Sequence, residues 1–189
     1  MNLKKRTTAL IAMAALAVPV VAYAGGKYKS IKESEVTVRG KATPGPIPWD
    51  LSAKNAVTIV DDGTTIKLKL DGHKLDSMIP GRQGHTMKYV FHKGETGKEK
   101  RTIEVAVTHE ALNKALASKA STVKATAQFS NGPVVPIDIT GLSVSSETAK
   151  GVIKVSREKL GITEKICIET LKICVEDQLT IEAEITYSK

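Results

Sequence analysis

Apolar and polar residues alternate with a period of two along most of the chain beyond residue 50. The strands that this alternation predicts contain residues 57–59, 66–68, 87–91, 103–107, 123–129, 135–139, 153–155 and 181–187. A period of two with one polar face is typical of antiparallel strands that pack on one side and face water on the other. About eight such strands predict a barrel or a two-sheet sandwich.

A helical period occurs once. Ala111, Leu112, Ala115 and Leu116 recur at the spacing of one helix face, and Thr108 can cap the first turn. The sequence therefore predicts one short helix over about 109–119.

Two turn signals predict hairpins and their register. Asp62-Gly63 suits a two-residue turn, which would pair Ile59 with Ile66 and Val57 with Leu68. A three-residue turn over 131–133 would pair Phe129 with Val135, whereas a two-residue turn would place the apolar face of the second strand outward.

Proline positions add two further expectations. Pro136 cannot donate to a strand ladder, so we expect it at a sheet edge or a bulge. The proline-rich segment 44–50 is predicted to be a rigid loop.

The first 24 residues have the three parts of a secretory signal peptide. Basic residues at 4–6 precede an apolar stretch over 7–21, and Ala22-Tyr23-Ala24 supplies the small residues of a cleavage site. The apolar stretch is shorter than the ~20 residues that span a bilayer. We expect cleavage after Ala24, a mature domain over 25–189 without a transmembrane segment, and a periplasmic or secreted location.

Charge and motif content exclude several classes of function. The net charge of +8 comes from scattered residues rather than from a basic stripe with aromatics, so we expect no nucleic-acid partner. The histidines at 73, 85, 92 and 109 lack metal-ligand spacing, and no nucleophile or nucleotide motif occurs. We expect no metal, no cofactor and no catalysis.

The two cysteines, Cys167 and Cys174, lie in one short segment. An exported protein meets an oxidising compartment, where an even pair favours a disulfide over a metal site. A hairpin capped by Thr170 and Leu171 would place the two cysteines opposite each other. A pair of free thiols is the alternative, because many cross-strand neighbours are too strained to bridge.

The inner face of the predicted sheet is a candidate site for an apolar ligand. An eight-stranded barrel either fills with its own side chains or holds one small molecule. The residues that we expect to contact such a ligand are Ile66, Leu68, Met87, Tyr89, Phe91, Ile103, Val105 and Ala125. A filled β-sandwich that binds another envelope protein is the alternative.

Four segments resemble the YceI-like family of lipid- and polyisoprenoid-binding proteins. The first runs from Leu75 to Tyr89 and contains Arg82 and His85, at the positions of the family's Arg and His. Segments 129–136, 151–162 and 175–181 resemble three further parts of the family pattern, in the same order.

The resemblance implies an eight-stranded antiparallel lipocalin-like barrel with a hydrophobic tunnel. The ligand it implies is a long apolar lipid of the polyisoprenoid, quinone or fatty-acyl type, bound without chemistry, with Arg82 and His85 near its polar headgroup. The sequence leaves a homodimer open.

Overall fold

The computed structural model describes residues 31–45, 47–75, 102–145, 147–163, 167–168 and 172–187. The expected signal peptide over 1–24 lies outside these residues. So do the strand expected at 87–91, which includes Met87, Tyr89 and Phe91, and the side chains of Arg82 and His85.

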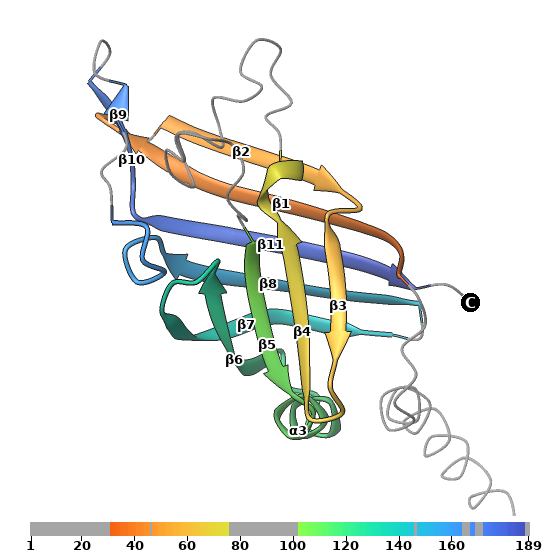
Figure 1. The fold of residues 1–189 in the computed structure, drawn as a ribbon. Coiled ribbons are helices and arrows are strands. Elements are labelled where there is room, and N and C mark those ends of the chain that lie inside the picture. Colours follow the sequence, from red (N-terminus) through yellow and green to blue (C-terminus); the bar gives the residue numbers. More distant parts are fainter. Residues whose placement is uncertain are drawn as a thin grey trace, which may run out of the picture.

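One antiparallel sheet contains all the described strands, in the order β3-β4-β5-β6-β7-β8-β11-β1-β10-β9, with β2 paired to β1 (Figure 1). The strands are β1 (Ile31–Thr43), β2 (Ile47–Lys54), β3 (Val57–Asp61), β4 (Thr65–Asp71), β5 (Thr102–Thr108), β6 (Thr122–Phe129), β7 (Val134–Val144), β8 (Thr148–Ser156), β9 (Cys167–Ile168), β10 (Ile173–Val175) and β11 (Gln178–Tyr187). The predicted class, a mainly β antiparallel lipocalin-like fold with one short helix, is confirmed, and the described residues form eleven strands where eight were predicted.

The sheet curls into a half-barrel with two facing walls. Figure 1 shows β3, β4 and β5 crossing in front of β1, β11 and β8, while β6 and β7 connect the two walls. The chain passes from the back wall to the front wall at Asn55, between β2 and β3. Asn55 has a positive φ of 54°, and Ser34 of β1 fixes this corner by exchanging hydrogen bonds with it. Asparagine tolerates such a backbone conformation better than most residues do.

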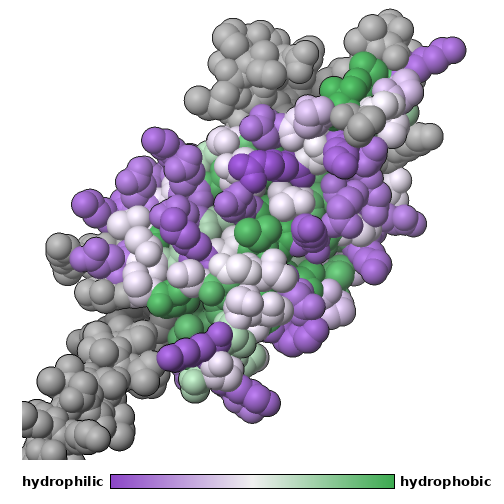
Figure 2. Space-filling model, turned by 180° about the vertical axis from the view of Figure 1, so that it is seen from behind, coloured by the Kyte–Doolittle hydropathy of each residue, from purple (hydrophilic) through white to green (hydrophobic). Residues whose placement is uncertain are grey.

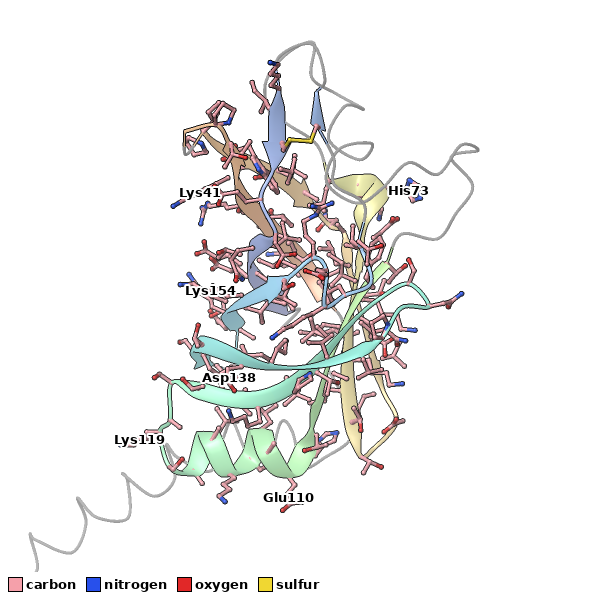
Figure 3. All side chains as sticks on the ribbon, turned by 90° about the vertical axis from the view of Figure 1, so that its left-hand side faces the viewer. Lys41, His73, Glu110, Lys119, Asp138 and Lys154 are labelled. Carbon is pink, nitrogen blue, oxygen red and sulfur yellow. A yellow bond between two sulfur atoms is a disulfide. The ribbon has the colours of Figure 1, made fainter. Side chains whose placement is uncertain are left out.

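The two ends of the half-barrel carry different elements. Helix α3 (His109–Ala117) lies across one end, and the β9–β10 hairpin with its disulfide projects from the other (Figure 3). Thr108 caps α3 as expected, because its hydroxyl accepts a hydrogen bond from the backbone N–H of Ala111. A short 3-10 turn, η1 (Gly72–Lys74), follows β4.

The inner face of the curled sheet is apolar and the outer face is charged. Figure 2 shows the molecule from behind, where hydrophilic side chains cover most of the surface between smaller apolar areas. Cross-strand ion pairs such as Lys150–Glu184 and Lys124–Asp138 account for part of this polar cover. The alternation of apolar and polar residues therefore separates a packed inner face from a polar outer face, as predicted.

Both predicted hairpin registers are wrong by two residues. Ile59 pairs with Leu68 rather than Ile66, because the Asp62 side chain accepts hydrogen bonds from the N–H groups of Thr64 and Thr65. Asp62 therefore initiates the turn instead of lying within it. A shift of two residues leaves each side chain on the same face, so the predicted core face is correct.

In the second hairpin, Ala127 pairs with Val135 rather than Ile137, and Phe129 does not pair with Val135. The connection is longer than three residues, because the N–H of Gly132 bonds the carbonyl of Phe129 within it. Pro136 lies outside the β7–β8 ladder, which pairs residues from Ile139 onward. Pro136 pairs with Thr126 of β6 on its other side, so the expected sheet edge is present only on the side of β7 that faces β8.

The segment 44–50 is only partly a loop. Pro44 and Gly45 form a turn, with a cis bond between Thr43 and Pro44, and β2 begins at Ile47. Trp49 pairs with Gly40 of β1, whose lack of a side chain leaves room for the indole ring. No helix among the described residues is long and apolar enough to cross a bilayer.

Candidate functional site

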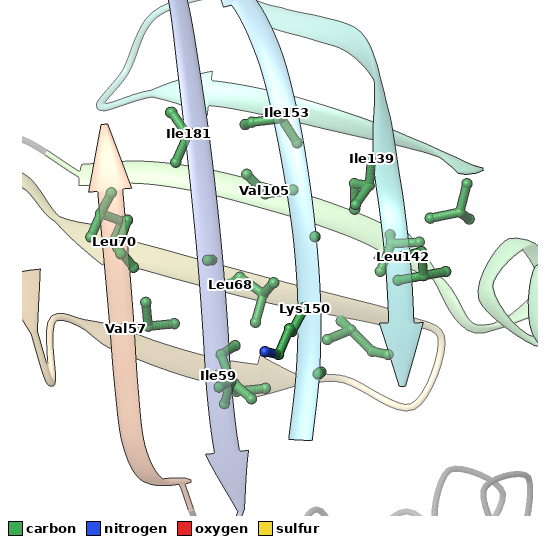
Figure 4. Close-up of a pocket in the computed structure, with 18 of the residues that line it drawn as sticks. Val57, Ile59, Leu68, Leu70, Val105, Ile139, Leu142, Lys150, Ile153 and Ile181 are labelled. Carbon is green, nitrogen blue, oxygen red and sulfur yellow. The ribbon is translucent and has the colours of Figure 1, made fainter. Parts of the chain in front are cut away.

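An apolar cavity lies between the two walls of the half-barrel (Figure 4). Ile59, Leu68 and Val105 form a row across three neighbouring strands of the front wall, because Leu68 pairs with both of the others. All three point to the inside of the sheet and line the cavity, yet each is only partly buried. Their incomplete burial shows that the interior is not filled at this level.

The back wall of the cavity is made of unusually small residues. Ala183 of β11 pairs with Gly151 of β8, and Ala149 lies next to them on the same face. Larger residues flank this set, since Ile181 pairs with Ile153 and Ile185 pairs with Ala149. A Cβ atom at position 151 would lie 2.7 Å from Cγ2 of Ile139, so the backbone itself forms the wall there.

An irregularity in β7 and the helix α3 close the cavity at two places. The register of β7 against β8 shifts between Thr140 and Ser143, and Leu142 at this bulge lines the cavity. Bulges commonly redirect side chains in this way. Leu112 of α3 covers the end that faces the helix.

The cavity has a volume of about 120 Å³. Among the described lining residues, Lys150 is the only charged one. Its ammonium group lies 2.8 Å from the Glu184 carboxylate on the outer face, and its half-exposed side chain marks where the lining reaches the surface. Such walls can hold an apolar group by burial.

Four of the predicted contact residues come together in this cavity. Ile66, Leu68, Ile103 and Val105 all line it. Met87, Tyr89, Phe91, Arg82 and His85 lie outside the described residues.

Ala125 is not among the residues of this cavity. It borders a shallow depression of about 490 Å³ whose other residues include Lys124, Asp138 and Lys154. An ion pair of 2.8 Å between Lys124 and Asp138 crosses this depression. We regard the smaller cavity as the site, because an open polar hollow with its own ion pair offers an apolar ligand little burial.

The sequence did not single out Ala183, Gly151 or Ala149 as contact residues. The alternation of apolar and polar residues predicts the two strands that carry them. Alanine and glycine, however, do not by themselves indicate an apolar lining. Their signal is the break in a series of Ile and Leu residues on one face, as in Leu179, Ile181, Ala183 and Ile185 of β11.

Arg157 is a buried charged residue outside the cavity. Its side chain is 3% exposed at the end of β8. Burial lowers the pKa of Arg157, and the charge of Asp177 opposes that change. Burial by itself would raise the pKa of Asp177, but the Ser156 hydroxyl, the N–H of Glu158 and the Arg157 charge hold it below its ordinary value. We interpret this cluster as a structural link between β8 and the start of β11.

A second polar contact fastens α3. His109 Nε2 lies 2.8 Å from Asp61 Oδ1, and both side chains are largely buried. The N–H of His109 also bonds the carbonyl of Thr64 in the β3–β4 turn. Within the described ranges, no group of three or more His, Cys, Asp or Glu residues is placed to hold a metal ion.

Cys167 and Cys174 are joined by a disulfide in the structure, with their Cα atoms 4.0 Å apart. The two residues are directly opposite each other in the β9–β10 ladder. Neither lines the cavity.

The fold is shared with two solved structures. It is similar to BcnA from Burkholderia cenocepacia, with a TM-score of 0.52 and 11% identity, covering 82% of this chain and 96% of that one. It is also similar to a polyisoprenoid binding domain from Saccharophagus degradans implicated in plant cell wall breakdown, with a TM-score of 0.52 and 14% identity, covering 84% and 99%. No protein-family model and no curated protein matches the sequence. The likeness bears out the resemblance to the YceI-like family at the level of the fold.

Proposed function

We propose that this chain is a YceI-like lipid-binding protein that takes the apolar part of an isoprenoid or acyl lipid into its cavity. The observation that carries the proposal is the cavity itself, which lies between the walls of one curled sheet and is lined by aliphatic side chains. The Saccharophagus degradans domain, whose fold this chain shares, is described as polyisoprenoid binding.

The binding mechanism that these walls support is burial without reaction. A five-carbon group that leaves water for such a cavity gains about 4 kcal/mol, at ~0.8 kcal/mol per carbon. This gain corresponds to a dissociation constant of about 1 mM before the costs of ordering the ligand. Because the ligand is bound without reaction, the protein would act as a carrier or a store. Binding tighter than about 1 mM would require contacts beyond those of the buried five-carbon group.

The proposed location is the periplasm or the exterior of the cell. Its support is the signal-peptide pattern ending at Ala24, together with a cysteine pair placed to form a disulfide. Expression with the native N-terminus, followed by cell fractionation and sequencing of the first residues, tests it. We expect Gly25 as the first residue of an extracytoplasmic protein, and an uncleaved cytoplasmic protein would contradict the location.

The alternative function, a filled β-sandwich that binds other envelope proteins, has less support. The described strands form one curled sheet rather than two packed sheets, and Leu68 and Val105 remain partly uncovered inside it.

Methyl NMR of the purified full chain, titrated with a five-carbon prenyl alcohol at millimolar concentration, tests the proposed function, because a dissociation constant of about 1 mM is too weak for a ligand to remain bound through purification. We expect the methyl signals of Leu68 and Val105 to shift in the wild type and to stay in place in Ala183→Leu, which fills the cavity. Ala106→Leu is the matched control, because Ala106 lies on the outer face of β5 between the lining residues Val105 and Val107. A wild type whose Leu68 and Val105 signals do not respond to the alcohol would contradict the proposal.

A further inference from the structure

We propose that the cavity accepts only the compact end group of a lipid tail, about the size of one isoprene unit. The tail would then enter end-on instead of lying at full length inside the protein. This inference rests on the proposed function and narrows the class of ligand.

The volume of the cavity sets the size of the guest. An engineered cavity of about 150 Å³ in another protein holds one benzene molecule, whereas sites for drug-sized ligands measure roughly 300–1,000 Å³. At about 120 Å³, this cavity has room for a group slightly smaller than benzene.

Packing of the interior prevents a longer tail from continuing inward. Along the inner face of β11, Leu179 is fully buried with 0% exposure, Ile181 is at the edge of the cavity, and Ala183 lines it. Leu51 and Leu160 are likewise fully buried and do not line the cavity. The half of the interior that contains these leucines is filled, so the cavity ends at the level of Ile181.

The entrance lies at the other end of the back wall. Val144 ends β7 and Ala149 follows the β7–β8 turn, and both line the cavity while remaining partly exposed. A tail that enters here meets the small residues Ala149, Gly151 and Ala183 before it reaches the Ile181 level.

A chain-length series tests the end-on mode. Prenyl alcohols of five, ten, fifteen and twenty carbons, and straight-chain alcohols of matching length, are titrated below their aggregation limits. Binding is followed by methyl NMR signals of Ile59, Leu68 and Val105 in the full chain. Each carbon buried in apolar surroundings should tighten binding about fourfold.

We expect affinity to change by less than about fourfold from five to twenty carbons, because only the end group is buried. The prenyl and straight-chain arms distinguish an isoprenoid end from an acyl end. An affinity that keeps rising through twenty carbons would overturn the end-on mode while supporting lipid binding. If no alcohol shifts the three methyl signals at any length, the proposed function fails as well.

The variants Ala183→Leu and Ala106→Leu test whether the alcohols bind in the cavity. We expect Ala183→Leu to weaken binding of the five-carbon prenyl alcohol at least tenfold, and Ala106→Leu to leave it within twofold. Equal binding by both variants would show that the probes bind elsewhere, and would overturn the inference.

Discussion

Replacing Ala183 with leucine distinguishes a hollow interior from a packed one. The free energy of unfolding should rise if the space is empty and fall if it is filled. The Ala183 side chain points into the cavity, and its neighbours in the ladder are Gly151 and Val36. Because Gly151 contributes no side chain, a leucine at 183 can extend into space that is empty in the wild type. The same change in a filled core would force neighbouring side chains apart.

The expected magnitude follows from the three carbons that leucine adds to alanine. Their burial stabilises by about 2.4 kcal/mol, at ~0.8 kcal/mol per carbon. The loss of rotamer freedom on burying leucine costs about 0.5–1 kcal/mol. The variant should therefore be more stable by about 1.5 kcal/mol, which lies within the usual range for cavity filling. Overpacking of a filled core would instead destabilise by about 1–3 kcal/mol.

Urea unfolding of ligand-free protein measures this difference. We expect the midpoint of Ala183→Leu to rise at an unchanged m-value, which attributes the shift to stability alone. Ala106→Leu, on the outer face, should change the free energy of unfolding by no more than about 0.5 kcal/mol. A loss of stability in Ala183→Leu, beside an unaffected Ala106→Leu, would refute the reasoning that the space is empty.

Three further predictions concern other parts of the fold. Gly40→Ala should destabilise by roughly 1–3 kcal/mol in urea unfolding and shift the Trp49 fluorescence, because a Cβ atom there would collide with Cζ2 of the indole. An unchanged midpoint would contradict the close contact. The pKa of Asp177 is lower in the folded state than its ordinary value of 3.8, so the stabilisation by this carboxylate is present above that value and is lost as the pH falls through the folded pKa. The urea midpoint of Asp177→Asn should therefore depend less on pH below about 4 than the midpoint of the wild type does. Identical pH profiles of the two proteins would count against this role of Asp177. Replacing both Cys167 and Cys174 with serine should lower the free energy of unfolding by about 2–3 kcal/mol, because the disulfide no longer restricts the unfolded chain. Ligand affinity should stay unchanged, because neither residue lines the cavity. A loss of affinity in titrations would show that the hairpin takes part in binding.

The sequence predicted the faces of the strands better than their partners. The core sides of β3, β4, β6 and β7 follow directly from alternation, and they remain correct although both hairpin registers are shifted by two residues. The exact register depends on which residues close each turn, as with the hydrogen bonds of Asp62. Sequence patterns identify a turn more readily than its boundaries.

The long strands β1 and β2 were missed for a different reason. Val36 and Val38 alternate with Thr37 and Arg39, but Gly40 interrupts this series and the prolines at 44 and 48 favour a loop. Pairing with β11 and with Trp49 of β2 keeps the strand continuous through Gly40. Tertiary contacts thus override a local preference.

The apolar front wall of the candidate site could be predicted, and the small residues that make the site hollow could not. Ile66, Leu68, Ile103 and Val105 belong to the cavity as expected, because any apolar residue on the inner face is a candidate. The empty space depends on Ala183 pairing with Gly151, a residue 32 positions away in the sequence on a different strand. That coincidence requires the β8–β11 register, which no local pattern contains. Ala125 borders a separate depression, although Val123 of the same strand lines the cavity.

The most direct test of the cavity is a crystal structure of the purified protein under xenon pressure. Xenon enters dry apolar cavities of this size and avoids filled or polar interiors. We expect a xenon atom between Leu68, Val105 and Ala183 in the wild type and none in Ala183→Leu. Continuous side-chain density across that space in the wild type, with no xenon bound, would contradict it.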